Sequence, residues 1–321
     1  MTNAQLALES LITKEELLKR PLRNTTAIDP ADPLEIDDAF NHIPLDKEGS
    51  QYHVQLHIAD AGLLIGHTAL ISAARESGWT QYDNSSPDLT KPMLPLDVYK
   101  TTLGLDATNE DGVPAVEISF DFDMKTRRVG NRSVNKVRVY TETLSYADHN
   151  QKLETSNKNK NEKRQARIRL GVARRILSPP NKINKIRGTH KSEDIVAYHM
   201  VAANRIMAKF MSDSETPWLF RNHSSGMYMA WRDPKERQIL TKIKPALYGR
   251  IPLFHDGLGI MPYCHFTSPL RRFPDLANHL NLHATLQGLD PVFSHEEMEN
   301  IGREMTELYI RRNTSIQSVA T

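Results

Sequence analysis

The chain has 321 residues, with 41 basic and 39 acidic side chains, a net charge of +2 and a mean hydropathy of −0.52. This length is sufficient for one large domain or two ordinary ones, and no apolar run approaches the roughly 20 residues of a membrane-spanning helix. The single cysteine, Cys264, excludes a disulfide framework and a zinc site made of several thiolates. The N-terminus contains acids and no continuous apolar stretch, so it resembles neither a signal peptide nor a transit peptide. We therefore expect a cytoplasmic protein without a membrane partner.

The predicted elements place strands early in the chain and helices late. A short helix within residues 1–20 ends before Pro21. Strands are predicted over 52–60, 115–123 and 133–146. Further helices are predicted over 68–79, 161–177, 192–212, 234–243, 270–287 and 295–312. This order is typical of an α+β fold with a mixed or antiparallel sheet, and we expect the N-terminal helix (1–20) to precede a single domain over 21–321.

Basic residues are concentrated in one stretch of the chain. Residues 158–187 contain 11 Lys or Arg and one acid, Glu162, so this segment carries +10 and the rest of the chain −8. Such a concentration favours contact with a polyanion. The alternative is a solvated helix face followed by a loop, which is what charge runs usually are. The tract 156–190 is predicted to be partly flexible.

A proline- and aspartate-rich loop, IDPADPLEIDDAF (28–40), contains five carboxylates within ten residues. They belong to Asp29, Asp32, Glu35, Asp37 and Asp38. The carboxylates repel one another unless a cation neutralises them, and oxygen ligands suit Mg²⁺ or Mn²⁺. Since Mg²⁺ usually shares its shell with a phosphate, the loop indicates phosphoryl transfer or phosphodiester hydrolysis. A surface turn rich in Asp and Pro is the alternative.

A second pattern, YCHFTSPLRRFPDLANH (263–279), supplies positive charge. Its Ser-Pro pair predicts a helix start with Ser268 as N-cap. Arg271 and Arg272 would then lie in the first turn, where cations oppose the helix dipole unless an anion binds there. Helix N-termini and arginine donors both favour phosphate. The alternative is a helix start with a salt bridge through Asp275.

Five blocks in the chain together carry a family resemblance. They are IDPADPLEIDDAF, HIAD (57–60), PMLP (92–95), MVAAN (200–204) and HFTSPLRRFPDL (265–276). Their order and spacing resemble the catalytic RNB domain of the ribonuclease II/ribonuclease R family over nearly the whole chain. The resemblance implies a Mg²⁺-dependent exoribonuclease, with Mn²⁺ as an alternative metal. Such an enzyme hydrolyses single-stranded RNA from 3′ to 5′ in a narrow channel and releases nucleoside 5′-monophosphates.

Carried over by motif position, the resemblance assigns roles to individual residues. Asp29 and Asp38 match principal metal ligands, and Asp37 matches an essential catalytic carboxylate. Glu35 stands where the family has a fourth aspartate, so it is both a candidate metal ligand and a departure from the pattern. Arg271 matches the family's catalytic arginine, which would stabilise charge on the attacked phosphate.

The remaining candidates are RNA-binding residues. Tyr82 matches a tyrosine near the RNA 3′ end, and Tyr146 matches one that stacks on bases. For both tyrosines, ordinary half-buried packing is the alternative. The other candidates share a position in the arginine motif or in the basic segment: Ser268, Arg272, Lys158, Lys160, Lys163 and Arg164.

Other departures weaken the resemblance. Ala197 and Tyr198 stand where the family has an acidic pair, and Glu193 or Asp194 are the nearest acids that could substitute. The flanking OB-fold domains of the family have no room in this chain, so we expect weaker grip on RNA, compensated in part by the basic segment or by an RNA-binding protein partner.

Three interpretations of function are therefore open. One is an active exoribonuclease. The second is a catalytically weak or inactive RNB-like protein that binds RNA or a protein. The third is a metal-binding structural domain without an RNA role.

Overall fold

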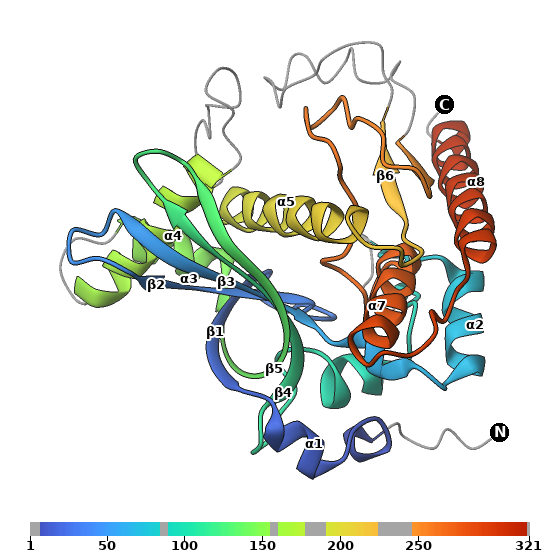
Figure 1. The fold of residues 1–321 in the computed structure, drawn as a ribbon, viewed down its shortest axis with the longest axis horizontal. Helices are drawn as coiled ribbons and strands as arrows, with labels where there is room; N and C mark the ends of the chain where they lie inside the picture. Colours follow the sequence, from blue (N-terminus) through green and yellow to red (C-terminus); the bar gives the residue numbers. More distant parts are fainter. Residues whose placement is uncertain (1–6, 84–88, 155–159, 177–190, 224–245, 320–321) are drawn as a thin grey trace. The chain divides into compact units, whose positions relative to one another are not determined.

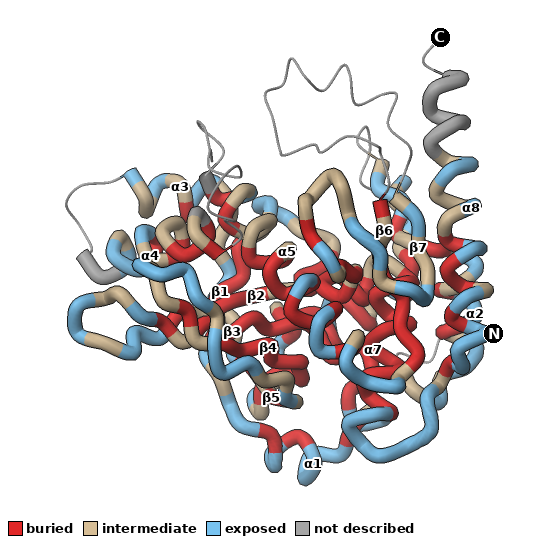
Figure 2. The backbone as a smooth tube through the Cα atoms, turned by 45° about the horizontal axis from the view of Figure 1, so that its top comes forward, coloured by how far each residue is buried: buried red, intermediate tan, exposed pale blue. Residues whose placement is uncertain are grey.

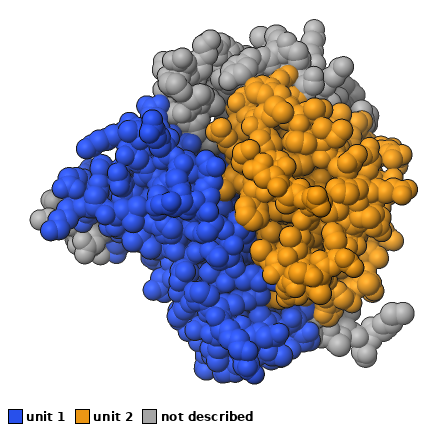
Figure 3. Space-filling model, viewed as in Figure 1, with its two compact units in different colours: residues 1–60, 95–203 blue, residues 61–94, 204–321 orange. Residues whose placement is uncertain are grey.

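The structure, a computed structural model, describes residues 7–83, 89–154, 160–176, 191–223 and 246–319. The chain divides into two compact units (Figure 3). Unit 1 comprises residues 1–60 and 95–203, and unit 2 comprises residues 61–94 and 204–321.

Unit 1 is built around a closed five-stranded barrel (Figure 1). Its strands are β1 (Leu22–Asp29), β2 (Asp38–Pro44), β3 (Gln51–Ala59), β4 (Val113–Asp123) and β5 (Val129–Ser145). Neighbouring strands from β1 to β5 are antiparallel, and a parallel pairing of β1 with β5 closes the barrel. The mixed sheet agrees with the predicted fold class.

Unit 1 also contains helices. They are α1 (Lys14–Lys19), α3 (Tyr146–Glu154), α4 (Lys160–Ile176) and the part of α5 (Lys191–Ser212) up to residue 203, with short turns η1 (Leu8–Ser10) and η4 (Val98–Thr102). The ring of His199 on α5 stacks on Phe40 of β2 at 4.5 Å between ring centroids, and its Nε2 lies 2.9 Å from Nε2 of His42. Arg169 of α4 donates to the Thr26 hydroxyl at 2.8 Å. These contacts attach α4 and α5 to β1 and β2.

Unit 2 is mainly helical. It contains η2 (Ala61–Leu64), α2 (Thr68–Ser77), α7 (Phe273–Leu286), α8 (His295–Val319) and a two-stranded sheet of β6 (Phe220–Asn222) and β7 (Leu247–Gly249). Helix α7 is buried over nearly its whole length (Figure 2). Gly62 allows η2 to approach it, because a Cβ at this position would lie 2.6 Å from Cβ of His283.

Most predicted elements are present, with boundaries shifted by a few residues. The strands predicted over 52–60, 115–123 and 133–146 correspond to β3, β4 and β5. The helix predicted over 234–243 lies outside the described residues. Among the described residues, the elements that were not predicted are β1, β2, α3, β6, β7 and the short turns η2 and η4.

Strand β1 escaped prediction because Thr25 to Ile28 are buried in succession, so the segment lacks a period of two. Strands β6 and β7 have three residues each, too few to produce a pattern. Among the described residues, no helix is both long enough and apolar enough to cross a bilayer.

Candidate functional site

The carboxylates of the acidic loop are gathered at one end of the barrel in unit 1. Asp29 is the last residue of β1 and Asp38 the first of β2. Because these strands are antiparallel neighbours, with Thr26 opposite Phe40, the two aspartates lie at the same barrel end. Glu35 and Asp37 are buried, Asp29 and Asp38 are half-buried, and Asp32 is exposed. The fold thus separates Asp32 from the other four.

Hydrogen bonds to its backbone hold this loop in place. The Pro33 carbonyl accepts from Nζ of Lys100 at 2.6 Å. The backbone N–H groups of Leu105 and Ala59 donate to the carbonyls of Ile36 and Asp37, each at 2.9 Å. Two segments of unit 1, residues 100–105 and the end of β3, therefore fix the path of the loop, and the carboxylates project from a supported backbone.

The carboxylate oxygens suit a hard cation. Oδ2 of Asp29, Oε2 of Glu35 and Oδ2 of Asp37 are all shielded from solvent. Among the described residues, no three His, Cys, Asp or Glu side chains converge in a geometry that would enclose a metal ion. Such a cage is not what Mg²⁺ requires, since it is usually held by one or two carboxylates together with waters and substrate phosphates. The loop fits Mg²⁺ in this manner and does not fit a structural Zn²⁺ or a Ca²⁺ cage.

Tyr146 lies close to the acidic loop in the strand register. It follows Ser145, the last residue of β5, and Ser145 pairs with Asp29 across the parallel β1–β5 ladder. The half-buried Tyr146 ring therefore belongs to the same barrel end as Asp29. Tyr82 belongs to unit 2, where its side chain is 49% exposed.

The basic candidates have different environments. Lys158 lies outside the described residues, and Lys160 is the first residue of α4. Arg164 is exposed and Lys163 half-buried. Arg169, from the same basic segment, is buried against Thr26 and therefore has a packing role.

The HIAD block forms buried polar contacts within unit 1. Nδ1 of His57 lies 2.9 Å from the Thr25 hydroxyl, and its Nε2 lies 3.2 Å from Oε2 of Glu117. The same Glu117 oxygen accepts from Nε of Arg23 and from Nε2 of Gln55, both at 2.9 Å. Burial opposes ionisation of Glu117, but the bonds from His57 and Arg23 outweigh it and lower the pKa of this carboxyl. His57 is therefore a packing residue of unit 1.

Asp60, the last residue of that block, forms a buried ion pair. Nη1 of Arg20 lies 2.7 Å from Oδ2 of Asp60, and the side chains are 9% and 1% exposed. The sequence patterns did not single out Arg20, Arg23 or Glu117. Their sequence neighbourhood contains no signal of the pairing, because the partners lie 40 or more positions apart.

The arginine motif in unit 2 differs from its predicted geometry. Helix α7 begins at Phe273 with Arg272 as N-cap, so Ser268 is not the N-cap and neither arginine lies in the first turn. The prediction was wrong because a second proline, Pro274, occupies the start of the helix, while 269–271 form a turn.

The motif forms a compact network before the helix. The backbone N–H of the buried Ser268 donates to Oδ1 of Asp275 at 2.9 Å, and its hydroxyl accepts from Nη2 of Arg271 at 3.1 Å. Arg272 pairs with the same Asp275 oxygen at 2.7 Å, so the predicted salt bridge is present. The backbone carbonyl of Arg271 accepts from the N–H of Thr80 at 2.9 Å. These contacts fix the backbone from which both guanidinium groups extend.

The MVAAN block supports the arginine motif through its last residue. Asn204 donates to Oη of Tyr263 at 3.1 Å and accepts from the backbone N–H of Phe266 at 2.9 Å. Cys264 lies between them, is fully buried, and contacts the Asn204 carbonyl. Burial raises the pKa of the Cys264 thiol, which makes this cysteine a packing residue and not a nucleophile.

The departures from the family pattern lie on α5. Ala197 and Tyr198 are half-buried. Glu193 and Asp194 are in the first turn of this helix, where acids favour the helix dipole. That position explains both acids without a role in binding.

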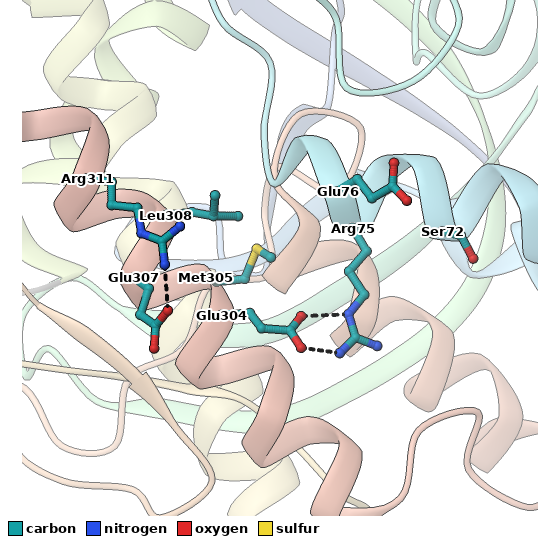
Figure 4. Close-up of a pocket in the computed structure, with 8 residues that line it drawn as sticks. All are labelled: Ser72, Arg75, Glu76, Glu304, Met305, Glu307, Leu308 and Arg311. Carbon is teal, nitrogen blue, oxygen red and sulfur yellow. Dashed lines mark hydrogen bonds and ion pairs between the residues drawn. The ribbon is translucent and has the colours of Figure 1, made fainter. Parts of the chain in front are cut away.

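Unit 2 also has a surface hollow of about 510 Å³ between α2 and α8 (Figure 4). Arg75 donates to both Glu304 oxygens at 2.8 and 2.7 Å, and Arg311 donates to Glu307 at 3.1 Å. Both arginines that line the hollow are therefore paired with glutamates of α8.

The comparison with protein families decides the classification. The family model for the RNB domain matches residues 19–237 and 227–288. The chain belongs to the RNB-domain family. Ribonuclease R of Helicobacter pylori is 25% identical over 318 residues, which cover 78% of this chain and 47% of that protein. Ribonuclease R of Thermotoga maritima is 34% identical over 77 residues, which cover 24% of this chain and 11% of that protein.

Solved structures share the RNB fold. An active-site mutant of the Dss1 exoribonuclease from Candida glabrata matches with a TM-score of 0.76 at 20% identity, covering 94% of this chain and 47% of that one. Mycoplasma genitalium RNase R in complex with ribose-methylated single-stranded RNA matches with a TM-score of 0.71 at 17% identity, covering 93% and 57%. Yeast Ssd1, a pseudonuclease, matches with a TM-score of 0.72 at 15% identity, covering 92% and 44%. The chain thus spans about half the length of these three proteins.

Proposed function

We propose that this chain is the catalytic part of a metal-dependent exoribonuclease. Its substrate is single-stranded RNA, which it hydrolyses from the 3′ end to nucleoside 5′-monophosphates. Membership of the RNB-domain family supports RNA hydrolysis in general. The observation that carries the finer proposal is the supported acidic loop, in which four carboxylates are gathered at one barrel end and the fifth, Asp32, points to solvent.

The residues divide the chemistry between them. Asp29, Asp38 and Glu35 would hold Mg²⁺ or Mn²⁺, which supplies charge stabilisation at the attacked phosphate and a more acidic bound water. The carboxylate of Asp37 orients the attacking water and accepts its proton. The guanidinium of Arg271 donates hydrogen bonds to the phosphate oxygens as negative charge develops on them. Tyr146 offers a stacking face to a base beside Asp29.

The proposal extends to partner and location. Single-stranded RNA is held by charge through the exposed part of α4 and through Arg272. An RNA-binding protein that provides OB-fold surfaces would increase grip on long RNA. We place this activity in the cytoplasm.

The second candidate function is a catalytically weak or inactive RNA-binding protein of the same family. Three observations support this candidate. The fold is similar to that of a pseudonuclease, Glu35 is longer than the aspartate of the family pattern, and Ala197 and Tyr198 replace its acidic pair. We favour the enzyme because Asp29, Asp37, Asp38 and Arg271 are all present. Burying a carboxylate such as Asp37 costs free energy, which favours a role in chemistry over a role in packing.

A labelled single-stranded RNA tests the proposal. With Mg²⁺ or Mn²⁺, a 5′-labelled RNA is expected to shorten progressively, while a 3′-labelled RNA releases labelled mononucleotide from the first turnover. Asp37→Asn should abolish both reactions and keep RNA binding, since it removes the negative charge and keeps the size and shape of the side chain. Asp32→Asn, in the same loop but exposed, is the matched control and should hydrolyse RNA at the wild-type rate.

Three results would contradict the enzyme. They are binding of RNA without hydrolysis by wild-type protein, hydrolysis by Asp37→Asn at the wild-type rate, or release of long internal fragments. The first result would favour the inactive RNA-binding protein. The second would remove the acidic loop from the mechanism.

A further inference from the structure

Arg221 in unit 2 is a buried cation that the proposed mechanism does not use. It is the middle residue of β6 and is only 6% exposed. Among the described residues it forms no ion pair and no side-chain hydrogen bond, and its Nη1 is shielded from solvent without a hydrogen-bond partner. Burying a charge without a partner is strongly unfavourable, so its retention requires an explanation.

Two aromatic rings contact the Arg221 guanidinium. Arg221 is directly opposite Tyr248 in the β6–β7 ladder, and its Cζ lies 4.2 Å from the centroid of that ring. The same Cζ lies 5.1 Å from the ring centroid of Tyr309 on α8. The backbone N–H of Tyr248 donates to the hydroxyl of Thr306 at 3.0 Å, one turn of α8 before Tyr309. The guanidinium is therefore oriented before any ligand arrives, and the part of the chain that the structure describes does not consume its N–H groups.

The charges around this guanidinium are predominantly positive among the described residues. Arg221 and Arg272 both act on Tyr248, and the acid that acts on it, Asp275, is already paired with Arg272 at 2.7 Å. Oη of Tyr248 lies 2.8 Å from Nδ1 of His265. Burial, followed by Arg272 and Arg221, holds the pKa of His265 well below its ordinary value. The cluster thus has an excess of cationic groups that an anion would neutralise.

We propose that Arg221 is a phosphate-binding residue, which receives a phosphodiester group of the RNA. This inference rests on the proposed function, since it assigns a substrate contact beyond those of the acidic loop and Arg271. A planar guanidinium with unused donors matches two phosphate oxygens at once, and stacking on aromatic rings leaves its edge available. Shielding from water strengthens the attraction to an anion. Tyr248 and Tyr309, the two residues whose rings contact the guanidinium, are themselves half-buried.

Salt-dependent RNA binding tests the proposal without requiring hydrolysis. Fluorescence anisotropy is measured in the Asp37→Asn background with a single-stranded oligoribonucleotide. Adding Arg221→Gln should weaken binding roughly tenfold. It should also lower the slope of log affinity against log salt by about 0.7, the value for one phosphate contact on a single strand. Arg221→Lys should recover the slope but only part of the affinity, because it keeps the charge and loses the planar fork.

Arg250→Gln is the matched control. It removes one positive charge from the same unit, but Arg250 is exposed and its Nε lies 3.4 Å from Glu299. We expect wild-type affinity and slope from this variant. A slope that falls equally in both variants would overturn the assignment, since the loss would then follow net charge and not Arg221.

A second measurement separates ligand binding from a structural role. Inorganic phosphate should raise the melting temperature of the wild-type protein above its value in chloride at equal ionic strength, and should not do so for Arg221→Gln. Without phosphate, Arg221→Gln should melt close to wild type, because the loss of stacking on Tyr248 and Tyr309 is offset by the removal of a buried charge that forms no ion pair among the described residues. A lower melting temperature together with an unchanged salt slope would make Arg221 a packing residue and overturn the proposal.

The two proposals fail differently. Suppose that wild-type protein does not hydrolyse RNA, but Arg221→Gln lowers the salt dependence of RNA affinity and abolishes the rise in melting temperature with phosphate. The nuclease assignment then fails and the phosphate site stands. If wild-type protein hydrolyses RNA and Arg221→Gln changes neither the salt slope of RNA binding nor the effect of phosphate on the melting temperature, the phosphate site fails and the nuclease assignment stands.

Discussion

At the scale of single residues, the ion pair between Arg20 and Asp60 shows how a motif residue can serve the fold. Both side chains are buried, and Lys136 also acts on Asp60. Breaking a buried pair by removing one partner is strongly destabilising, since it leaves the other charge uncompensated. We interpret the aspartate of the HIAD block as a stabilising residue of unit 1.

Asp60→Asn is therefore expected to lower the free energy of unfolding by about 3–5 kcal/mol. Urea denaturation followed by circular dichroism measures the change. Glu15→Gln is the control, because Glu15 pairs with Lys19 on the exposed face of α1 and such pairs contribute little. Equal stability of Asp60→Asn and wild type would show that the buried pair is not a source of stability.

Arg271, in contrast to Asp60, is proposed to act in catalysis. Its backbone is held by Thr80, and its Nη2 donates to the Ser268 hydroxyl. If Arg271 stabilises charge in the transition state, Arg271→Ala should lower kcat by about 100-fold or more while RNA affinity changes little. Single-turnover hydrolysis and anisotropy measure the two quantities separately. A loss confined to affinity would reassign Arg271 to substrate positioning.

At the scale of elements, α4 combines two roles along one basic helix. Arg169 is buried against Thr26, whereas Arg164 and Arg167 are exposed. The inward residue attaches the helix to β1, and the outward residues present positive charge. A count of charges along 158–187 cannot distinguish these roles, because only packing decides which face of the helix meets the barrel.

The exposed charge predicts a salt effect on RNA binding. Changing Lys158, Lys160, Lys163 and Arg164 together to Gln should flatten the slope of log affinity against log salt by roughly 0.7 for each phosphate that these side chains neutralise. Release of long RNA should become faster, and cleavage of a very short oligonucleotide should stay nearly unchanged. Salt titrations of wild type and the fourfold variant measure the slopes. If the slopes are identical, this part of the chain is only a solvated face.

At the scale of the whole molecule, buried histidines make stability depend on pH. His42 and His199 contact each other between β2 and α5, and Arg169 lies near both. Burial and the neighbouring cations lower the pKa of His199 to about 4 and that of His42 well below 6.5. The unfolded chain therefore binds more protons than the folded one below pH 6.5, so stability is complete above this pH and declines toward pH 4.

For His199 alone, the full loss corresponds to about 3 kcal/mol. Denaturation in urea between pH 7.5 and 4.5 should show this decline. It should be shallower in His199→Gln, which cannot be protonated at this site. His295→Gln is the control, because His295 is exposed at the start of α8. An identical decline in His199→Gln and wild type would exclude the histidine pair as its source.

Local patterns in the sequence were sufficient to predict many of the helices and strands. Strands β3 and β4 and helices α2, α4, α5 and α8 follow from periodicity and capping residues, because each pattern lies within one segment. The motifs in the acidic loop and in residues 265–276 were sufficient to predict membership of the RNB-domain family. Their roles in catalysis and metal binding stay predictions.

Long-range pairing decided the rest. Only the antiparallel β1–β2 pair places Asp29 and Asp38 at one barrel end, and only the β1–β5 ladder adds Tyr146 to it. The stacking of Arg221 depended on a strand partner 27 positions away and on α8. The sequence of a segment reveals which secondary structure its neighbouring residues favour. Which distant side chains share a buried environment is set by tertiary packing, because burial makes an unpaired charge costly and a paired one acceptable.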